Sequence, residues 1–122
     1  MKFKKAHGYC YYYSYPAKEW RAILGLVYVV SLPACKEFPE LRGQAMMVYV
    51  DENPPCCSEQ LRWVVAHVAT SSIVSRGRTR KAAAEGADYA IRTEGPTKTI
   101  EAIRRQLAKL PPHPAVTFED RA

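Results

Sequence analysis

The sequence contains no apolar run long enough to cross a membrane. Its longest run, from Ala22 to Leu32, is broken by Ser31 and has about half of the ~20 residues that a membrane-spanning helix needs. The stretch from His7 to Pro16 is polar and aromatic, so it does not form the apolar core of a secretion signal. These absences predict a cytoplasmic protein that makes no use of a membrane.

Cysteine is sparse, and its spacing suits neither disulfides nor a metal. Of the four cysteines, Cys10 and Cys35 are isolated, whereas Cys56 and Cys57 are neighbours that would form a strained ring if joined to each other. His7 and Cys10 are three residues apart, but the paired C-x-x-C spacing of structural zinc is missing. We therefore predict reduced thiols, no metal site and no cofactor.

Motifs for catalysis are also missing. The chain has no G-x-S-x-G and no H-E-x-x-H, and residues 95–99 (GPTKT) lack the spacing of a phosphate-binding loop. What remains is a set of isolated side chains at predicted element ends or on a predicted helix: Asp51, Glu52, Cys56, Cys57 and His67. The helix dipole would lower the pKa of a thiol at such a helix start. Nothing links these residues into a set, so the sequence predicts a protein that is not an enzyme.

Length and composition are those of an ordinary globular domain. The 122 residues are 48% hydrophobic, which suffices for one core without metal or disulfide staples. We expect residues 1–122 to form a single domain. Residues 111–122 begin with two prolines and have no strong pattern, so they are expected to form a loosely ordered tail.

The first half of the chain favours strands. Residues 9–15 are rich in tyrosine and end at Pro16, and residues 23–30 are apolar on both alternations, as in a strand covered on both faces. A polar loop bracketed by two prolines separates them from a third strand at 45–50.

Residues 57–73 change to a helical period. Their apolar residues fall at positions i, i+3, i+4 and i+7, counted from Leu61. A helix with this apolar face would place Trp63 and His67 on its opposite side. An exposed tryptophan needs a partner, which is either another part of the chain or a bound protein.

The last third predicts two more helices and a strand. Residues 82–85 are good helix formers, Gly86 stands where a C-terminal cap belongs, and residues 87–93 resemble a strand. Pro96 opens a last helix with an apolar stripe, which ends before Pro111. This order predicts an α+β fold: a small, mainly antiparallel sheet of three N-terminal strands and one later strand, with the C-terminal helices packed on one face.

Positive charge is concentrated in the second half of the chain. Residues 1–61 carry seven Lys or Arg and six Asp or Glu, whereas residues 62–122 carry eleven and six. One group surrounds Gly77, and a second follows one side of the last predicted helix. Charged side chains also lie outside for solubility alone, and Glu101 is spaced to pair with Arg105.

A basic loop next to a glycine can follow a phosphate backbone, because each cation that neutralises a phosphate releases counterions. Our leading prediction is therefore a non-enzymatic binding protein whose partner is nucleic acid or another polyanion, such as an acidic protein surface. The predicted contact residues are Arg76, Arg78, Arg80, Lys81, Lys98, Arg105 and Lys109.

A rival prediction is a protein-binding inhibitor or adaptor. Alternate residues of a strand share a face, so the tyrosines at 9–15 would present a row of rings. Tyrosine gives a large contact area at low entropic cost, although such a row is also typical of a half-buried strand or of base stacking. The predicted anchors are Tyr9, Tyr11, Tyr13, Trp63 and His67, and a homodimer is one form that such binding would take.

A third prediction concerns Gly95. The helix that starts at Pro96 has free backbone N–H groups that can hold a small anion such as a nucleotide. Arg92 and Lys98 would assist it.

Overall fold

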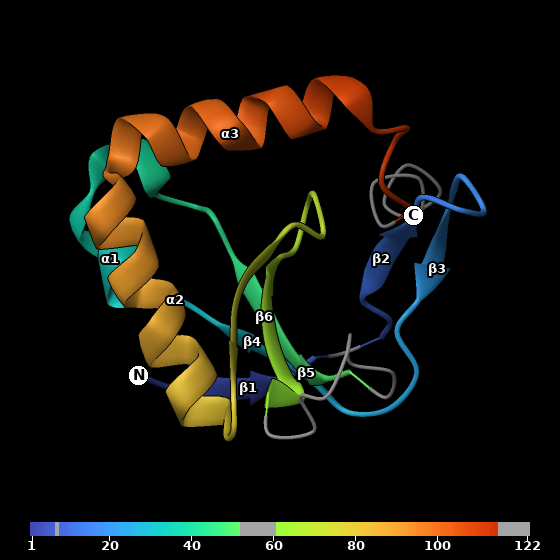
Figure 1. Ribbon diagram of the computed structural model, residues 1–122, viewed down its shortest axis with the longest axis horizontal. Coiled ribbons are helices and arrows are strands. Elements are labelled where there is room, and N and C mark those ends of the chain that lie inside the picture. Colours follow the sequence, from blue (N-terminus) through green and yellow to red (C-terminus); the bar gives the residue numbers. More distant parts are fainter. Residues whose placement is uncertain (7, 52–60, 115–122) are drawn as a thin grey trace.

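The computed structural model describes residues 1–6, 8–51 and 61–114. It has an α+β fold, as predicted, with a five-stranded antiparallel sheet and a separate two-stranded hairpin (Figure 1). The strands are β1 (Phe3–Lys5), β2 (Tyr11–Ser14), β3 (Glu19–Ala22), β4 (Val27–Val30), β5 (Met46–Val50), β6 (Trp63–His67) and β7 (Ile73–Gly77). The helices are α1 (Pro33–Glu37), the 3-10 turn η1 (Pro39–Leu41), α2 (Arg80–Glu94) and α3 (Pro96–Lys109).

The main sheet has the strand order β1-β4-β5-β6-β7, and among the described strands β2 pairs only with β3. The predicted strand at 45–50 is confirmed as β5, and parts of the predicted strands at 9–15 and 23–30 form β2 and β4. Strands β1 and β3 were not predicted, because each is short and lacks an apolar run. The predicted loop between the two prolines contains α1 and η1.

The helix predicted for residues 57–73 is wrong. Its described part forms β6, a tight turn and the first residue of β7. The consecutive residues Val64, Val65 and Ala66 are all fully buried, because β6 is an inner strand with both faces covered. A strand that is apolar on both alternations also places apolar residues at i, i+3 and i+4, so periodicity alone did not separate the two structures.

The predicted strand at 87–93 is also wrong, since helix α2 continues through it to Glu94. Gly86 lies inside this helix rather than at its end. A Cβ atom there would stand 2.6 Å from Ser75 Oγ of β7, so the glycine lets the helix pack closely against the sheet. Ala83, Ala84 and Ala87 line the same contact and are fully buried.

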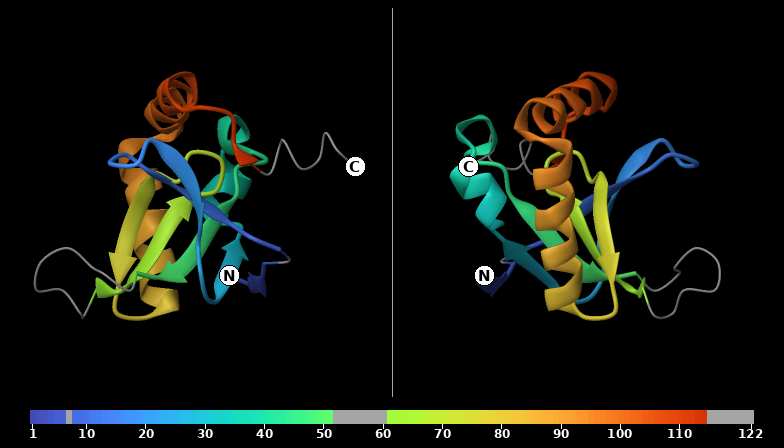
Figure 2. Two further views of the ribbon diagram at one scale, coloured as in Figure 1. Left: turned by 90° about the vertical axis from the view of Figure 1, so that its right-hand side faces the viewer. Right: turned by 60° about the vertical axis from the view of Figure 1, so that its left-hand side comes forward.

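Helix α3 begins at Pro96, as predicted, and ends before Pro111. Its apolar stripe is only partly used, because Ile103 is buried while Leu107 is 49% exposed. The helix contacts α2 and η1 and extends across one end of the sheet (Figures 1 and 2). In the described part of the chain, every helix is too short or too polar to span a membrane.

Two apolar clusters cover the two faces of the sheet. The larger one packs α1, η1 and α2 against side chains such as Val30, Val48 and Val65. The smaller one lies on the opposite face and includes Met47 and Val64. Helices α1 and α2 thus lie on one face of the sheet, as predicted for the C-terminal helices, whereas α3 lies across one end of it. The smaller cluster leads toward the β2–β3 hairpin.

The hairpin is attached to the segment that follows α3. The indole of Trp20 donates a hydrogen bond to the carbonyl of Pro111 (3.1 Å), and its ring lies 4.7 Å from that of His113. Tyr11 and Tyr13 make edge contacts within the same ring cluster. The beginning of the predicted loose tail therefore contacts the hairpin, while residues 115–122 are outside the described residues.

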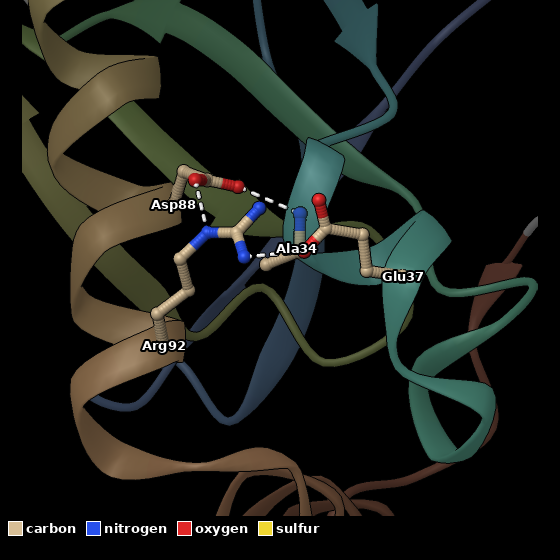
Figure 3. Close-up of polar contacts among 4 residues, drawn as sticks. All are labelled: Ala34, Glu37, Asp88 and Arg92. Carbon is tan, nitrogen blue, oxygen red and sulfur yellow. Dashed lines mark hydrogen bonds and ion pairs between the residues drawn. The ribbon is translucent and has the colours of Figure 1, made fainter.

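A polar clamp joins α1 to α2 (Figure 3). Asp88 accepts a hydrogen bond from the backbone N–H of Ala34 (2.7 Å) and a second from Arg92 Nε (2.8 Å). Arg92 also forms an ion pair with Glu37. This guanidinium lowers the pKa of the Glu37 carboxyl through hydrogen bonding and charge. The clamp fixes the first turn of α1 on the middle of α2.

Candidate functional site

The first turn of α2 gathers positive charge from two distant parts of the sequence. The guanidinium carbon of Arg80 stands 4.8 Å from the ring centre of Phe3 and 4.4 Å from that of Tyr28. Both distances are within the range of cation–π attraction. Phe3 belongs to β1, which pairs with β4, so this contact places the start of α2 beside the N-terminal lysines (Figure 1).

We call the resulting surface the basic edge, and it consists of Lys2, Lys4, Lys5, Arg78, Arg80 and Lys81. All of these side chains are exposed except Arg80, which is half-buried under its stacking contacts. The first turn of α2 contains no acidic residue, and its backbone dipole adds to the positive potential. Lys81 approaches Glu85 at 3.9 Å, but both are largely exposed, so this pair contributes little.

Arg76 does not belong to the basic edge. It lies on the sheet face opposite the helices, and its guanidinium forms an ion pair with Asp51 at 3.1 Å. Both side chains are about three-quarters covered, so the pair is less screened than a surface pair. Of the four cations predicted as one loop, this one is separated from the others because the strand alternates faces.

The second predicted group lies at the opposite end of α2. Helix α2 has 15 residues, so its ends are about 20 Å apart at 1.5 Å per residue. Lys98 and Arg105 of α3 line a cavity of about 610 Å³ at this end, whereas Lys109 is exposed farther along the helix. The two predicted basic groups are therefore two separate sites rather than one surface.

Buried His67 stands in the wall of this cavity and does not carry charge there. Its Nε2 donates to Gln44 Oε1 (2.7 Å), and its Nδ1 accepts from the hydroxyl of Thr70 (2.9 Å). Burial lowers the pKa of this imidazole to about 4. His67 is only 2% exposed, so it is a structural residue and does not serve as the surface anchor that the helical reading implied.

The other predicted anchors divide between core and surface. Trp63 is half-buried and packs against the main core, because it points toward the helices from β6. Tyr11 and Tyr13 face Trp20 and His113, and Tyr9 alone of the three is largely exposed (70%). Sequence reasoning missed Trp20, although its position across a turn from the tyrosine strand was a signal for hairpin pairing.

The candidates for catalysis and metal binding are not brought together. Asp51 is paired with Arg76, and Glu52, Cys56 and Cys57 lie outside the described residues. Within the described ranges, no three His, Cys, Asp or Glu side chains are grouped closely enough to hold a metal ion. Burial raises the pKa of the Cys10 and Cys35 thiols, which makes them weak nucleophiles.

Of the two cations predicted to assist an anion site at Gly95, one faces away from it. Arg92 is turned toward Asp88 and Glu37, so it does not face the start of α3. The carbonyl of Gly95 accepts hydrogen bonds from the backbone N–H and the hydroxyl of Thr99, and Lys98 lines the neighbouring cavity instead.

Comparison with protein-family models, curated proteins and solved structures finds no match for this chain. We therefore infer its function from its own residues.

Proposed function

We propose that this chain is a non-enzymatic binding protein of the cytoplasm whose basic edge contacts the phosphate backbone of nucleic acid. The observation that carries the proposal is the stacking of Arg80 on Phe3 and Tyr28. It joins the exposed lysines of β1 to the cations at the start of α2. The free thiols Cys10 and Cys35 support a reducing compartment.

The chemistry of the basic edge favours contacts to phosphate over contacts to bases. The Arg80 guanidinium lies over one face of each of the two aromatic rings, so that face is not open for base stacking. Exposed lysine and arginine side chains bind phosphate without reading sequence. We therefore expect binding that depends strongly on salt and weakly on sequence.

Edge lysines have a second use, because they also keep exposed sheet edges from pairing with other chains. An experiment must therefore distinguish located phosphate contacts from a general effect of net charge. The chain offers a matched control, since three cations of the basic edge and three cations of α3 can each be neutralised together.

The test compares two triple variants of equal net charge. One is Lys4→Gln, Lys5→Gln and Lys81→Gln at the basic edge, and the other is Lys98→Gln, Arg105→Gln and Lys109→Gln on α3. Fluorescence anisotropy of labelled single-stranded and duplex DNA and RNA is measured from about 50 to 300 mM salt.

We expect the basic-edge variant to reduce the slope of log affinity against log salt by about 2 to 3, because each lost phosphate contact removes about 0.7 to 0.9. The α3 variant should keep the wild-type slope. Equal losses in both variants, or a slope near zero in the wild type, would exclude the proposal.

Binding of a protein surface is a second candidate, supported by an exposed apolar patch. Leu24 is 82% exposed and Leu26 is 51% exposed, and both border a hollow of about 200 Å³ together with Tyr9. Apolar side chains grouped in this way are typical of contact surfaces. A second copy of the chain is the simplest partner to test.

Sedimentation velocity over a concentration series is the appropriate measurement. Self-association in the wild type that is lost in Leu24→Ser, and kept in the control Leu107→Ser on α3, would support this candidate. A wild-type chain that stays monomeric at all concentrations would exclude self-association through the patch.

A further inference from the structure

The cavity at the C-terminal end of α2 is built by three parts of the fold. Helix α3 forms its roof, the last turns of α2 form one wall, and the β6–β7 turn with the first residue of β5 forms its floor. Figures 1 and 2 show α3 lying across this end of the sheet. The roof is held at both ends, because α3 packs on α2 and η1, and the hairpin bonds to Gln106 and Pro111. Its volume of about 610 Å³ is in the range of small-molecule sites.

The lining of the cavity is mixed: it includes the polar residues Thr70, Ser72, Thr99 and Gln106 and a group of apolar side chains. Met46, Val74, Ile91 and Ile103 line it, and each belongs to a different strand or helix. His67 adds ring surface without charge, because both of its nitrogens are bonded to protein groups. Apolar lining residues of this kind favour a ligand with an apolar body.

The charged residues of the cavity alternate in sign along its roof. Lys98, Glu101 and Arg105 follow one another at steps of three and four residues, which keeps them on one side of α3. Glu94 adds a second carboxylate from the end of α2. Among the described residues, the lining therefore carries two cations and two anions, whose charges balance.

We propose that this cavity binds a small zwitterion with an apolar body, the chemistry of an apolar amino acid or dipeptide. The ligand's carboxylate would lie near Arg105 or Lys98, and its ammonium group near Glu101 or Glu94. The apolar body would be buried between Ile103 and the strands. This proposal is independent of the basic edge, which lies at the other end of α2.

Three probes with one apolar body test the proposal on the full chain. They are the dipeptide Phe-Leu, its N-acetyl form and its C-terminal amide, which are a zwitterion, an anion and a cation. Binding is measured by isothermal titration calorimetry and by shifts of backbone amide resonances.

We expect Phe-Leu to bind about 5- to 10-fold more tightly than either blocked form, because only the zwitterion satisfies both signs of charge. Arg105→Gln should weaken Phe-Leu and the acetylated form by about 5- to 10-fold and leave the amide unchanged. Arg104→Gln is the matched control, since this neighbouring arginine does not line the cavity.

A second pair of variants separates the cavity from the rest of the surface. Ala102→Phe fills space beneath the roof, whereas Ala108→Phe adds the same ring to an exposed part of α3 that does not line the cavity. If Ala102→Phe alone abolishes binding of all three probes, and both variants keep the wild-type Tm, the result would support the site. Failure of the wild type to bind Phe-Leu at millimolar concentration, or equal binding of the three probes, would overturn it.

Discussion

The two ends of helix α2 carry similar cations in opposite settings. At the N-terminal end, Arg80 and Lys81 are joined by the lysines of β1, and the first turn contains no acid. At the C-terminal end, Lys98 and Arg105 alternate with carboxylates around a cavity of mixed lining. The first setting is a surface of one sign that suits a polyanion, and the second is a neutral recess that suits a small ligand.

This difference shows that the position of a charge along the chain does not determine its partner. Both groups were predicted as phosphate contacts because each is dense in Lys and Arg. What separates them is long-range packing: stacking on Phe3 adds cations at one end, and the turn into α3 adds Glu94 and Glu101 at the other. The two ends of α2 should therefore be held, and should act, independently of each other.

The largest effect is expected for Gly77→Ala, next to the basic edge. A Cβ atom at Gly77 would stand 2.5 Å from the backbone nitrogen of Ala83, so the start of α2 must move away from β7. We expect a loss of about 3 kcal/mol in the free energy of unfolding, measured by urea denaturation, because backbone atoms cannot yield as a flexible side chain does.

Gly86→Ala is the matched control within the same contact. There the nearest atom is the Ser75 hydroxyl, and alanine favours a helix interior by about 1 kcal/mol. Its cost should be clearly smaller and should vanish when Ser75→Ala is added. Equal costs for the two glycines would contradict the packing described for the start of α2.

The second largest effect is expected at acid pH, where protonation of His67 in the cavity wall should lower the stability of the fold. The pKa of His67 is lowered to about 4 in the folded chain, against about 6.5 in the unfolded chain. As the pH falls, the unfolded state therefore takes up its proton first. The contribution of neutral His67 to the free energy of unfolding is fully present above pH 6.5, falls between pH 6.5 and 4, and falls no further below pH 4. The lost contribution is about 3 kcal/mol at most.

Urea denaturation at several pH values measures this decline. Other groups titrate in the same range, including His113, whose pKa burial also lowers. The comparison is therefore with His67→Gln, in which the decline between pH 6.5 and 4 should be clearly smaller. An unchanged pH profile in His67→Gln would show that this imidazole is not buried neutral.

A smaller loss of stability is expected when the polar clamp that joins α1 to α2 is removed. Asp88→Ala removes the acceptor of the Ala34 N–H and one partner of Arg92, and the Asp88 side chain is only 17% exposed. We expect a loss of about 2 kcal/mol by thermal or urea denaturation. Asp88→Asn keeps an oxygen for the Ala34 N–H, so it should lose less than Asp88→Ala; the reverse order would contradict the hydrogen bond.

The sequence was sufficient to predict the α+β class, strand β5 and the start of α3. These features depend on local signals, such as a short apolar run or a proline at a helix start. It was not sufficient for β6 or the second half of α2. Their assignment depends on which neighbours cover Val64 and on how closely Gly86 approaches Ser75, and both are contacts between distant parts of the chain.

The same limit applies to the sites. Exposed Arg78 and Lys81 could be predicted from local composition, whereas the exclusion of Arg76 depends on the alternation of β7 and on Asp51. The N-terminal lysines could not be assigned to the basic edge without the ring stacking of Arg80. The cavity was not predicted at all, because its walls come from four separate segments.

The smallest expected change in stability, at Arg80, gives the sharpest test of the basic edge. Arg80→Ala removes stacking on two rings that is worth about 1 kcal/mol, and with it the contact between the start of α2 and Phe3 of β1, which stays paired with β4. If the stacking assembles the basic edge, affinity for oligonucleotides should fall by more than the loss of one phosphate contact. Arg80→Lys keeps the charge and part of the stacking, so its affinity should lie closer to that of the wild type.

Anisotropy titrations at fixed salt compare both variants with Lys81→Gln, which removes one exposed charge from the same turn. Equal losses in Arg80→Ala and Lys81→Gln would mean that the cations at the start of α2 act singly and that β1 contributes nothing.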